Sequence, residues 1–600
     1  MHPSIRNTRI ICSIGPAVGT DELVRSLIKK GMNLARFNLS HDTHEFHAGN
    51  IARVKKISKE EGVPIALILD TKGPEIRTGL IRNDAKIAFA KDDLVDVVAE
   101  SDAIKLYGDD GAFTEKTRVT VNYDQLADDI IPNVKILIAD GLLALMVLSV
   151  EGRVIKCKVV NNAEIGSKKN VNVIGVKTKL PALTEKDKVD LLFGHQQDLD
   201  YIAASFVRKA SDVITIQKYL SEIGSNMPVI AKIEDEEGLN NIEEIIRVAA
   251  GIMVARGDLG VQIPAERVPL EQKRIIRLCN AAGKPVITAT QMLDSMIRNP
   301  TPTRAEAGDV ANAIFDGTDC IMLSGETSSG SYPEAAVTVM ESIARAVESS
   351  DEYLKHLYER RREKGAGIDL THTISNAASW VADKIEAACI IAPTLSGNTA
   401  KLISRYRPRR PIIAASPSEV VRRRLLLYWG IIPVAIEQQE DSEAMIQSAI
   451  TQAIQKGFAA SLDKVIVVSG IPIRSPLATN NIRVHVIGNV LGKGGEGFGK
   501  HCTGRIVKVN NFQEAAAALM VKKESKILVT HNFDSSFTPI LPIIDGIILE
   551  GASEVSQEYM QKVNHDIVVL SYVPNAMSQF GENITVTLDG TEKLIYEGSL

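Results

Sequence analysis

The sequence contains few cysteines and no long apolar run. Its six cysteines are scattered over 600 residues, and no two form a CxxC pair or another spacing typical of a metal site. We therefore expect reduced, buried thiols in a cytoplasmic protein. No apolar run reaches the roughly 18 residues of a membrane-spanning helix, and the start, MHPSIRNTRIIC, lacks the apolar core of a signal peptide.

A large excess of one charge is also absent. The formal net charge is −5, which favours neither nucleic acid nor a membrane surface as the main partner. Hydrophobic residues make up 45% of the chain and charged residues 24%, as in ordinary globular proteins with a sizeable core. A chain of 600 residues predicts about three to five domains.

Short apolar runs rich in Val and Ile, each followed by polar or glycine residues, predict buried strands. Helical patterns separate most of them, which indicates a parallel sheet covered on both faces. Eight such units predict a closed (β/α)₈ TIM barrel, which we assign to 1–79 and 178–350. The predicted strands are 8–14, 32–38, 64–71, 200–206, 228–234, 251–257, 285–291 and 319–326.

The pattern changes between the third and fourth strands. Several short strands follow one another there without long helical stretches. We interpret 80–177 as a small all-β, β-barrel-like domain inserted in a barrel loop. Loops at this face surround the active site of such barrels, so the insertion could act as a lid.

The rest of the chain predicts two further units. Helices and strands alternate again over 355–487, which indicates an open α/β domain. The stretch GNVLGKGGEGFGK (488–500) holds six glycines and is typical of a flexible linker. The segment 488–600 as a whole predicts an additional small α/β domain, with several strands and one helix.

Polar residues follow the second and third barrel strands. In a TIM barrel the active site lies at the carboxyl ends of the strands. Oxygen-bearing groups at these two ends could coordinate a weakly bound monovalent cation, and arginines suit bidentate contact with phosphates. The oxygen ligands would come from Asn38, Ser40, Asp70 and the carbonyl of Thr71, and the arginines are Arg36 and Arg77.

The fifth to eighth strands end in a second polar group. Glu234 and Asp258 come from adjacent strands and could hold one Mg²⁺, which prefers oxygen ligands. Lys232 supplies a positive charge for a phosphoryl group, and Gly257 lets backbone amides approach an anion. Together the set offers positioning and charge neutralisation, which is what phosphoryl transfer mainly requires.

Each of these residues alone has an ordinary structural explanation. A lysine or glutamate in a barrel mouth is often half of an ion pair, and Asp258 could cap a helix. Thr290 and Ser324 could be satisfied hydroxyls, and His41 by itself indicates nothing. Their number at one end of the barrel favours a functional site over these separate explanations. Charged or hydroxyl residues end six of the eight strands, and burying that many without a ligand is costly.

At these positions the sequence resembles the pyruvate kinase family over about 1–487. The most specific strings are GMNLARFNLSH (31–41), LDTKGPEIRTG (69–79), VIAKIEDEEGL (229–239) and IMVARGDLGVQIPAE (252–266). The resemblance implies the last step of glycolysis, in which a phosphoryl group passes from phosphoenolpyruvate to ADP and gives pyruvate and ATP. It also implies a homotetramer with Mg²⁺ (or Mn²⁺) and K⁺.

The resemblance further implies roles for single residues. Lys232 would stabilise the transferring phosphoryl group, and Thr290 with Ser324 would belong to the proton path to pyruvate. Glu234 and Asp258 would bind Mg²⁺. Potassium would be bound by Asn38, Ser40, Asp70 and Thr71. Phosphoenolpyruvate would contact Arg36, Lys232, Gly257, Asp258 and Thr290. The nucleotide would be met by Arg77, Lys169 from the lid, and His41.

The α/β domain of this family usually binds a phosphorylated effector. The loop TLSGNTAK (394–401) resembles that pocket, and its hydroxyls and amides precede a helix, which suits an anion. An ordinary helix cap at Ser396 would explain the loop equally well, and GIPIRSPLATN (470–480) departs from the glycine- and threonine-rich loop of the family. The effector, a sugar phosphate or a nucleotide, would contact Thr394, Ser396, Gly397, Asn398 and Thr399.

The last 110 or so residues resemble the extra C-terminal domain of some bacterial pyruvate kinases, which is similar to the phosphohistidine domain of phosphoenolpyruvate-utilising enzymes. The corresponding stretch, LEGASEVSQEYM (549–560), has Ser556 near the histidine position and contains no histidine. We therefore expect no phosphate carrier. Smaller departures are Asp235, Asn170 and Ala139, which remove none of the expected ligands.

Two other functions remain open from the sequence. A catalytically inactive relative could serve as a metabolite sensor, but such a copy should have lost a metal carboxylate or Lys232. A different barrel enzyme, such as a lyase acting on a similar acid, would leave Arg77 and Lys169 without a purpose. A protein that does not bind ADP would favour the lyase over the kinase.

Overall fold

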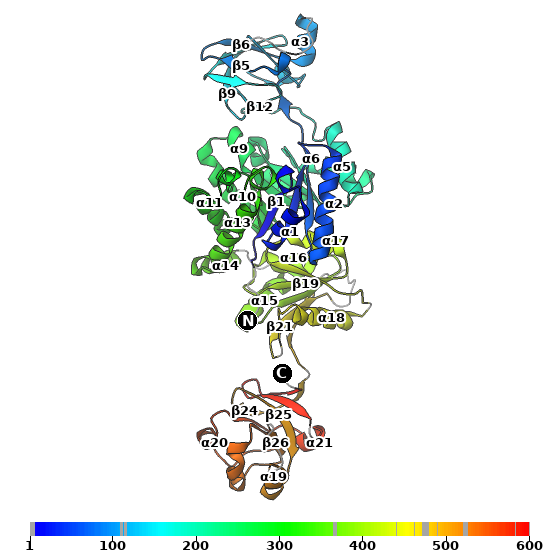
Figure 1. Cartoon of the computed structure of the whole chain (residues 1–600), viewed down its shortest axis with the longest axis vertical. Helices are drawn as coiled ribbons and strands as arrows, with labels where there is room; N and C mark the ends of the chain where they lie inside the picture. Colours follow the sequence, from blue (N-terminus) through cyan, green and yellow to red (C-terminus); the bar gives the residue numbers. More distant parts are fainter. Residues whose placement is uncertain are drawn as a thin grey trace.

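The computed structural model describes residues 6–107, 112, 117–363, 369–439, 441–460, 462–470, 479–488, 490–519, 526–582 and 584–598. Four units follow one another along the long axis of the molecule (Figure 1). The inserted sheet lies at one end, the barrel and the α/β unit follow, and the C-terminal unit lies at the other end. No helix of the described residues is long and apolar enough to cross a membrane.

The eight predicted parallel strands form a closed barrel, which confirms the TIM-barrel prediction. Around the barrel the order is β1-β17-β16-β15-β14-β13-β3-β2. The strands are β1 (Arg9–Ser13), β2 (Leu34–Asn38), β3 (Ala66–Asp70), β13 (Tyr201–Ala204), β14 (Val229–Ile233), β15 (Gly251–Ala255), β16 (Val286–Ala289) and β17 (Cys320–Leu323).

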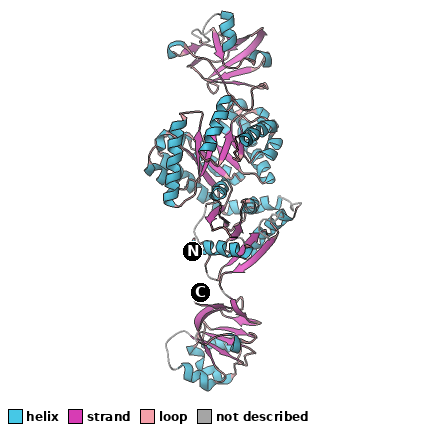
Figure 2. Ribbon diagram, turned by 90° about the vertical axis from the view of Figure 1, so that its right-hand side faces the viewer, coloured by secondary structure: helices cyan, strands magenta, loops and turns pink. Residues whose placement is uncertain are grey.

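Alternation along each strand divides the barrel core into two layers. In β1, Ile10 and Cys12 pack into the layer between strands and helices, and Ile11 packs into the barrel interior. Successive strand side chains point to opposite faces, so both faces are buried. Figure 2 shows helices around the strands of the barrel. The helices of this part of the chain are α1 (Asp21–Lys29), α2 (His44–Glu61), α5 (Glu185–Gln196), α6 (Ala210–Glu222), α7 (Glu236–Asn240), α8 (Ile242–Val248), α9 (Arg256–Gln262), α10 (Val268–Ala282), α11 (Arg304–Asp316), α12 (Gly325–Ser328), α13 (Pro333–Glu348) and α14 (Asp351–Glu363).

The inserted region is mainly β-structure, with one difference from the all-β prediction. An eight-residue helix, α3 (Glu100–Tyr107), follows β6, and α4 (Leu126–Asp129) adds a turn. The larger sheet has the order β4-β12-β8-β9-β10-β6-β7, and β11 pairs with β5. Its first strand, β4 (Ile76–Arg77), precedes residue 80. The other strands are β5 (Ile87–Phe89), β6 (Leu94–Ala99), β7 (Arg118–Val121), β8 (Lys135–Ile138), β9 (Leu143–Glu151), β10 (Val154–Val159), β11 (Ala163–Ile165) and β12 (Asn170–Val173).

The α/β unit after the barrel is built on one five-stranded sheet. Its order is β20-β19-β18-β21-β22, and only β22 runs antiparallel to its neighbour. The strands are β18 (Ile390–Pro393), β19 (Ile412–Ser416), β20 (Ile431–Ala435), β21 (Lys464–Ser469) and β22 (Asn481–Val486). The helices are α15 (Leu370–Lys384), α16 (Asn398–Arg405), α17 (Glu419–Arg424) and α18 (Ser442–Gln455).

The C-terminal unit has an eight-stranded sheet in the order β23-β30-β29-β25-β26-β27-β28-β24. Its helices are α19 (Phe512–Leu519), α20 (Gln557–Val563) and α21 (Ala576–Gln579). Its strands are β23 (Val490–Lys493), β24 (Glu496–Phe498), β25 (His501–Lys508), β26 (Lys526–Thr530), β27 (Gly546–Leu549), β28 (Val568–Ser571), β29 (Thr585–Asp589) and β30 (Leu594–Glu597).

The prediction of a flexible linker over 488–500 is wrong. This segment forms β23 and β24, which pair with β30 and β28. Its glycines are required by close packing. A Cβ on Gly497 would lie 2.7 Å from Leu570 Cδ2, and one on Gly499 would lie 2.5 Å from the carbonyl of Ile567. Gly499 also has a φ of +89°, which side chains rarely adopt.

Candidate active site

The fifth strand places Lys232 at the centre of a buried network at the carboxyl end of the barrel. Its ammonium donates to Asp70 Oδ1 at 3.1 Å and to Ser205 Oγ at 2.7 Å, and it lies 2.9 Å from Glu234 Oε1. Lys232 and Glu234 are two residues apart on one strand, so they share a face, as the sequence predicted. Asp70 comes from β3, so the network joins strands on both sides of β13.

A second cation completes the charge balance of this network. The Arg36 guanidinium donates to Asp70 Oδ2 at 2.6 Å and to Ser13 Oγ at 2.8 Å. Asp70 is fully buried, so its charge is balanced by Arg36 and Lys232 and not by water. Such a carboxylate would be costly to bury alone, and the two cations compensate for its desolvation.

The pKa values follow from this arrangement. Burial by itself raises the pKa of Asp70, but Arg36 and Lys232 outweigh it and hold the pKa below its usual range. Burial alone would lower the pKa of Lys232, but Asp70 and Glu234 raise it above its usual range, so the lysine is charged. Burial raises the pKa of Glu234 to about 8, against the attraction of Lys232, and the negative charge of Asp258 acts in the same direction.

Glu234 and Asp258 form a fitting pair for a divalent metal. Their charges interact strongly enough for Asp258 to raise the pKa of Glu234. A buried carboxylate whose ionisation is disfavoured by a second carboxylate nearby is stabilised by a cation bound between the two. Among the described residues, no three His, Cys, Asp or Glu side chains cluster as metal ligands. A metal held by this pair would complete its shell with substrate oxygens and water, as Mg²⁺ does.

The oxygens predicted to bind a monovalent cation lie around the ends of β2 and β3. Asn38 and Asp70 are direct neighbours in the strand register. Asn38 Oδ1 accepts from the Ser40 amide at 3.2 Å, which brings that residue back toward the strand end. The carbonyl of Thr71 accepts from Ser205 Oγ at 2.7 Å and keeps a second lone pair. This set is rich in oxygen, as K⁺ requires.

The sixth and seventh strands place Gly257 beside Thr290. Gly257 lies in the first turn of α9, and its amide donates to Thr290 Oγ1 at 2.7 Å. Thr290 has a φ of +65°, a strained conformation for a β-branched residue. Arg256 holds the strained turn, because its guanidinium donates to the Thr290 carbonyl at 2.7 Å and to Asp309.

Ser324 follows the eighth strand. Its Oγ is buried and has no hydrogen-bond partner within the described part of the chain. Its amide donates to Glu326 Oε2 at 2.8 Å, which fixes the backbone. A buried hydroxyl without a partner is costly in an ordinary core, so this one suits a site that a ligand or water completes.

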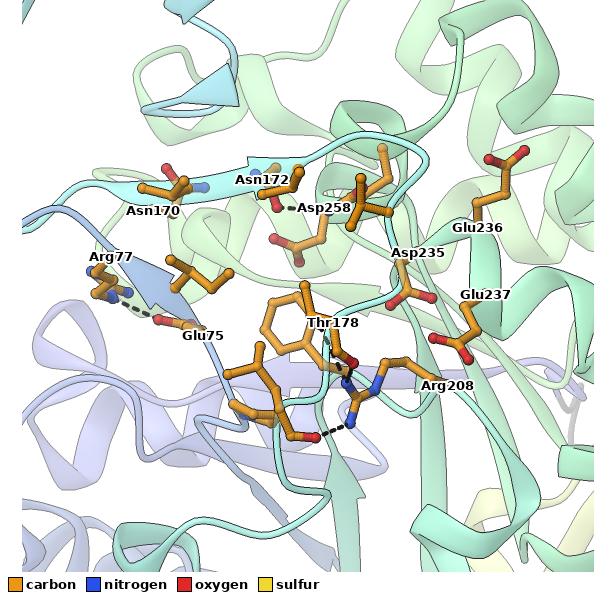
Figure 3. A pocket seen from close by; sticks show the side chains of 18 of the residues that line it. Glu75, Arg77, Asn170, Asn172, Thr178, Arg208, Asp235, Glu236, Glu237 and Asp258 are labelled. Carbon is orange, nitrogen blue, oxygen red and sulfur yellow. Dashed lines mark hydrogen bonds and ion pairs between the residues drawn. The ribbon is translucent and has the colours of Figure 1, made fainter. Parts of the chain in front are cut away.

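A cavity of about 540 Å³ lies between the barrel mouth and the inserted sheet. It is lined by four of the predicted residues, namely His41, Arg77, Lys169 and Asp258. Figure 3 shows Arg77 and Glu75 on one side and Asp235, Glu236 and Glu237 on the other. Arg77 is fixed by Glu75 at 2.6 Å and by the Lys168 carbonyl at 3.0 Å. Arg36, Lys232, Glu234, Asp70, Thr290 and Ser324 do not line this cavity.

One hydrogen bond crosses from the inserted sheet to the barrel at the edge of this cavity. Gln262 on α9 donates through Nε2 to Asn172 Oδ1 on β12 at 2.8 Å. Both residues also line the cavity. The contact therefore ties the inserted region to the helix that carries Asp258.

Sequence reasoning missed several residues of the site. Ser13 ends the first strand and Ser205 directly follows the fourth, so a search of every strand end for hydroxyls would have found them. Arg256, next to the glycine singled out above, gave no local signal because its partners lie 34 and 53 residues away. The backbone amide of Phe206, which donates to Glu234 Oε2 at 2.5 Å, leaves no trace in a sequence.

The structure describes only part of the proposed effector pocket. Gly397, with a φ of +84°, is the residue before α16, and Thr394 Oγ1 accepts from its amide at 2.9 Å. Ser396 is therefore not the capping residue, although its Oγ accepts weakly from the Asn398 amide at 3.4 Å. Thr399 Oγ1 lies 3.0 Å from Thr479 Oγ1. Most of the facing loop, 471–478, lies outside the described residues.

Family comparison decides between the alternatives. The model of the pyruvate kinase barrel domain matches residues 5–337, more than half of the chain. The chain belongs to the pyruvate kinase family. The model of the pyruvate kinase alpha/beta domain matches 372–485. Two bacterial relatives extend this similarity over almost the whole chain, and one solved structure is similar over 80% of it.

The chain is 42% identical over 598 residues to a pyruvate kinase of Sporosarcina psychrophila, which covers 99% of both chains. It is 40% identical over 597 residues to that of Staphylococcus aureus strain MRSA252, again over 99% of both. A crystal structure of a pyruvate kinase from Cryptosporidium parvum has a TM-score of 0.75 and 36% identity, and the match covers 80% of this chain and 96% of that one. The chain is thus an enzyme with pyruvate kinase activity, and its substrates are phosphoenolpyruvate and ADP.

Proposed function

We propose that phosphoryl transfer takes place at the carboxyl ends of β14 and β15, with Lys232 as the residue that stabilises the transferring group. The observation that supports this most strongly is the triple contact of Lys232 with Asp70, Ser205 and Glu234. It holds a charged ammonium at a fixed place in a buried site. Preorganised charge of this kind is the main contribution a protein makes to phosphoryl transfer.

Phosphoenolpyruvate would be bound in the mouth of the barrel, between the side that carries Arg36 and the side that carries Gly257. Arg36 can pair with its phosphate, since a guanidinium matches phosphate geometry. The Gly257 amide and Thr290 would meet its carboxylate and enol end. Glu234 and Asp258 would hold Mg²⁺ or Mn²⁺, which when bound neutralises phosphate charge and orients the phosphoryl group for transfer.

Potassium binding is proposed for the oxygen set at the ends of β2 and β3. The ligands would be Asn38, Ser40, Asp70 and Thr71. Three of these ligands carry only partial charges and the fourth is the Asp70 carboxylate, a combination that suits a weakly held monovalent cation. The sequence TKGPEIR, with Glu75, resembles that of the family members that require K⁺, and this resemblance supports the same assignment.

The nucleotide would occupy the cavity under the inserted region. Arg77 and Lys169 would contact its phosphates, with His41 at the rim. This supports a lid function for 80–177, because the cavity has walls from both the lid and the barrel. After transfer, Thr290 and Ser324 would take part in delivering the proton that converts enolpyruvate to pyruvate, and the unpaired Ser324 Oγ fits that role.

The remaining assignments concern regulation and assembly. We propose that 355–487 forms the effector-binding and subunit-contacting domain of a homotetramer. The loop from Thr394 to Thr399 would bind a sugar phosphate or nucleotide. We also propose that 488–600 is a further domain and that the enzyme works in the cytoplasm. All six cysteines are free thiols, which agrees with a reducing compartment.

The experiment that tests this proposal is an ion titration of pyruvate release from phosphoenolpyruvate and ADP. We expect turnover with Mg²⁺ and K⁺ and a much slower rate when Na⁺ replaces K⁺. Turnover that needs Mg²⁺ but is equal in Na⁺ and K⁺ would contradict the potassium assignment. A folded protein without turnover under any condition would contradict the assignments to the catalytic site, and binding of sugar phosphates would then be measured instead.

A further inference from the structure

Ser205 occupies a position between the two halves of the proposed site. It follows directly after β13 and is buried, with 6% of its surface exposed. In the barrel, β13 stands between β3 and β14. The residue therefore lies between the strand that carries Asp70 and Thr71 and the strand that carries Lys232.

The hydroxyl of Ser205 has contacts to both strands. Lys232 Nζ lies 2.7 Å from its Oγ, and the Thr71 carbonyl lies 2.7 Å from it on the other side. Asp70 Oδ1 is farther away, at 3.3 Å. An ammonium can only donate, so Ser205 accepts from Lys232 and gives its single proton to Thr71.

The backbone reinforces this link. The Ser205 amide donates to Thr71 Oγ1 at 3.2 Å, and the Thr71 amide donates to the Ala203 carbonyl at 3.0 Å. Gly73, in the turn after β3, has a φ of +71°, and a Cβ on it would lie 2.8 Å from Ser205 Cβ. The turn that presents the Thr71 carbonyl is thus packed directly on Ser205, and a shift of one moves the other.

Ser205 also fixes the direction of the lysine. The three protons of the Lys232 ammonium have three acceptors, namely Asp70, Ser205 and Glu234. Glu234 is the acceptor assigned to the metal site. If the third proton turns to a phosphoryl oxygen when substrate binds, Asp70 and Ser205 would be the two acceptors that keep the ammonium in place.

We propose that Ser205 is a positioning residue that couples the potassium ligands to Lys232. This inference rests on the function proposed above for Thr71 and Lys232. The hydroxyl orients the Thr71 carbonyl, whose free lone pair would be available to the cation, and holds the ammonium at the same time. A change at the cation site then reaches the lysine through one oxygen atom.

The test is Ser205→Ala in the full-length protein, with binding and turnover measured separately. K⁺ binding is followed by the shift of the thermal unfolding midpoint with KCl, at constant ionic strength and without substrate. We expect the K⁺ concentration for half of the shift to rise about five- to ten-fold, and kcat at saturating K⁺ to fall by about ten-fold or more, as expected for the loss of a hydrogen bond to a charged group. The KM for phosphoenolpyruvate and the Mg²⁺ midpoint stay within about two-fold, because Arg36, Glu234 and Asp258 keep their contacts.

Ser13→Ala is the matched control, because Ser13 is also a buried serine at a strand end but contacts Arg36 instead of Lys232. We expect it to raise the KM for phosphoenolpyruvate and to leave the K⁺ midpoint unchanged. If Ser205→Ala lowers kcat but leaves K⁺ binding as in wild type, the coupling is refuted. If the wild-type protein itself shows no response to K⁺, both this inference and the potassium assignment fail. This outcome can be distinguished from failure of the coupling alone, because it is seen in the wild-type protein without any variant.

Discussion

Lys232 Nζ and Glu234 Oε1 lie 2.9 Å apart at the carboxyl end of β14, and both side chains are almost fully buried. The two residues share one face of a strand because strand side chains alternate. This places the proposed phosphoryl-stabilising charge and the proposed metal carboxylate in direct contact. The site is thereby electrostatically coupled, since a change at either residue alters the ionisation of the other.

The metal assignment predicts the effect of Glu234→Gln. This change keeps the size of the side chain and removes its charge, so the affinity for Mg²⁺ should fall. We expect the Mg²⁺ concentration for half-maximal rate to rise and kcat to fall by about 10²-fold or more. Glu243→Gln, on the exposed face of α8, is the control and should behave as wild type. An unchanged Mg²⁺ dependence in Glu234→Gln would show that the metal is held elsewhere.

The hydrogen bond between Gln262 and Asn172 predicts a role in lid closure. Gln262→Ala removes a contact between α9 and the inserted sheet, so closure over the nucleotide should become less favourable. We expect the KM for ADP to rise about five-fold, with little change in the KM for phosphoenolpyruvate. Gln217→Ala removes a similar contact, to the Val248 carbonyl, away from the cavity and serves as the control. Equal ADP constants in both variants would contradict a role for this bond in closure.

The packing of the glycine-rich segment predicts the effect of Gly499→Ala. The new Cβ would collide with the Ile567 carbonyl, and the left-handed φ of +89° adds strain. We expect the C-terminal unit to lose about 2 kcal/mol or more of unfolding free energy, seen as earlier proteolysis and unfolding of this unit. In the control Gly49→Ala the added Cβ meets nothing within 4 Å. A Gly499→Ala variant as stable as the control would indicate that the segment is a free linker after all.

The C-terminal unit should not carry a phosphoryl group. Ser556, near the position of the family histidine, caps α20 by accepting from the Tyr559 amide. A serine in this role is a helix cap and lacks the nucleophilic imidazole of a phosphate carrier. We expect no acid-labile label in 488–600 after incubation with radiolabelled phosphoenolpyruvate. A labelled histidine in a peptide from this unit would overturn that expectation.

The barrel could be predicted from the sequence because its signals are local. Each strand is buried on both faces, so eight apolar runs of similar length could be recognised without knowing their partners. Much of the candidate site was predictable for the same reason, since Lys232, Glu234 and Asp70 lie at the ends of those runs. The barrel topology then brings them together without further information from the sequence.

Other features depend on contacts that a local pattern does not contain. Glycine is typical of flexible linkers and also of close packing, and Gly497 belongs to the second kind because of Leu570, which is distant in the chain. Ser205 is similar, because its partners Thr71 and Lys232 lie 134 and 27 residues away. Such residues become recognisable only when the fold supplies their neighbours.

The most direct test of the role proposed for Lys232 is ADP-dependent pyruvate release by Lys232→Met, compared with wild type at saturating Mg²⁺ and K⁺. Methionine keeps an unbranched side chain that is one atom shorter and removes the charge, and Lys218→Met on the exposed surface of α6 controls for the substitution itself. We predict that kcat of Lys232→Met falls by about 10³-fold or more, while its thermal unfolding shows a folded protein. A folded Lys232→Met variant that turns over within about ten-fold of wild type would contradict the claim that this ammonium stabilises the transferring phosphoryl group.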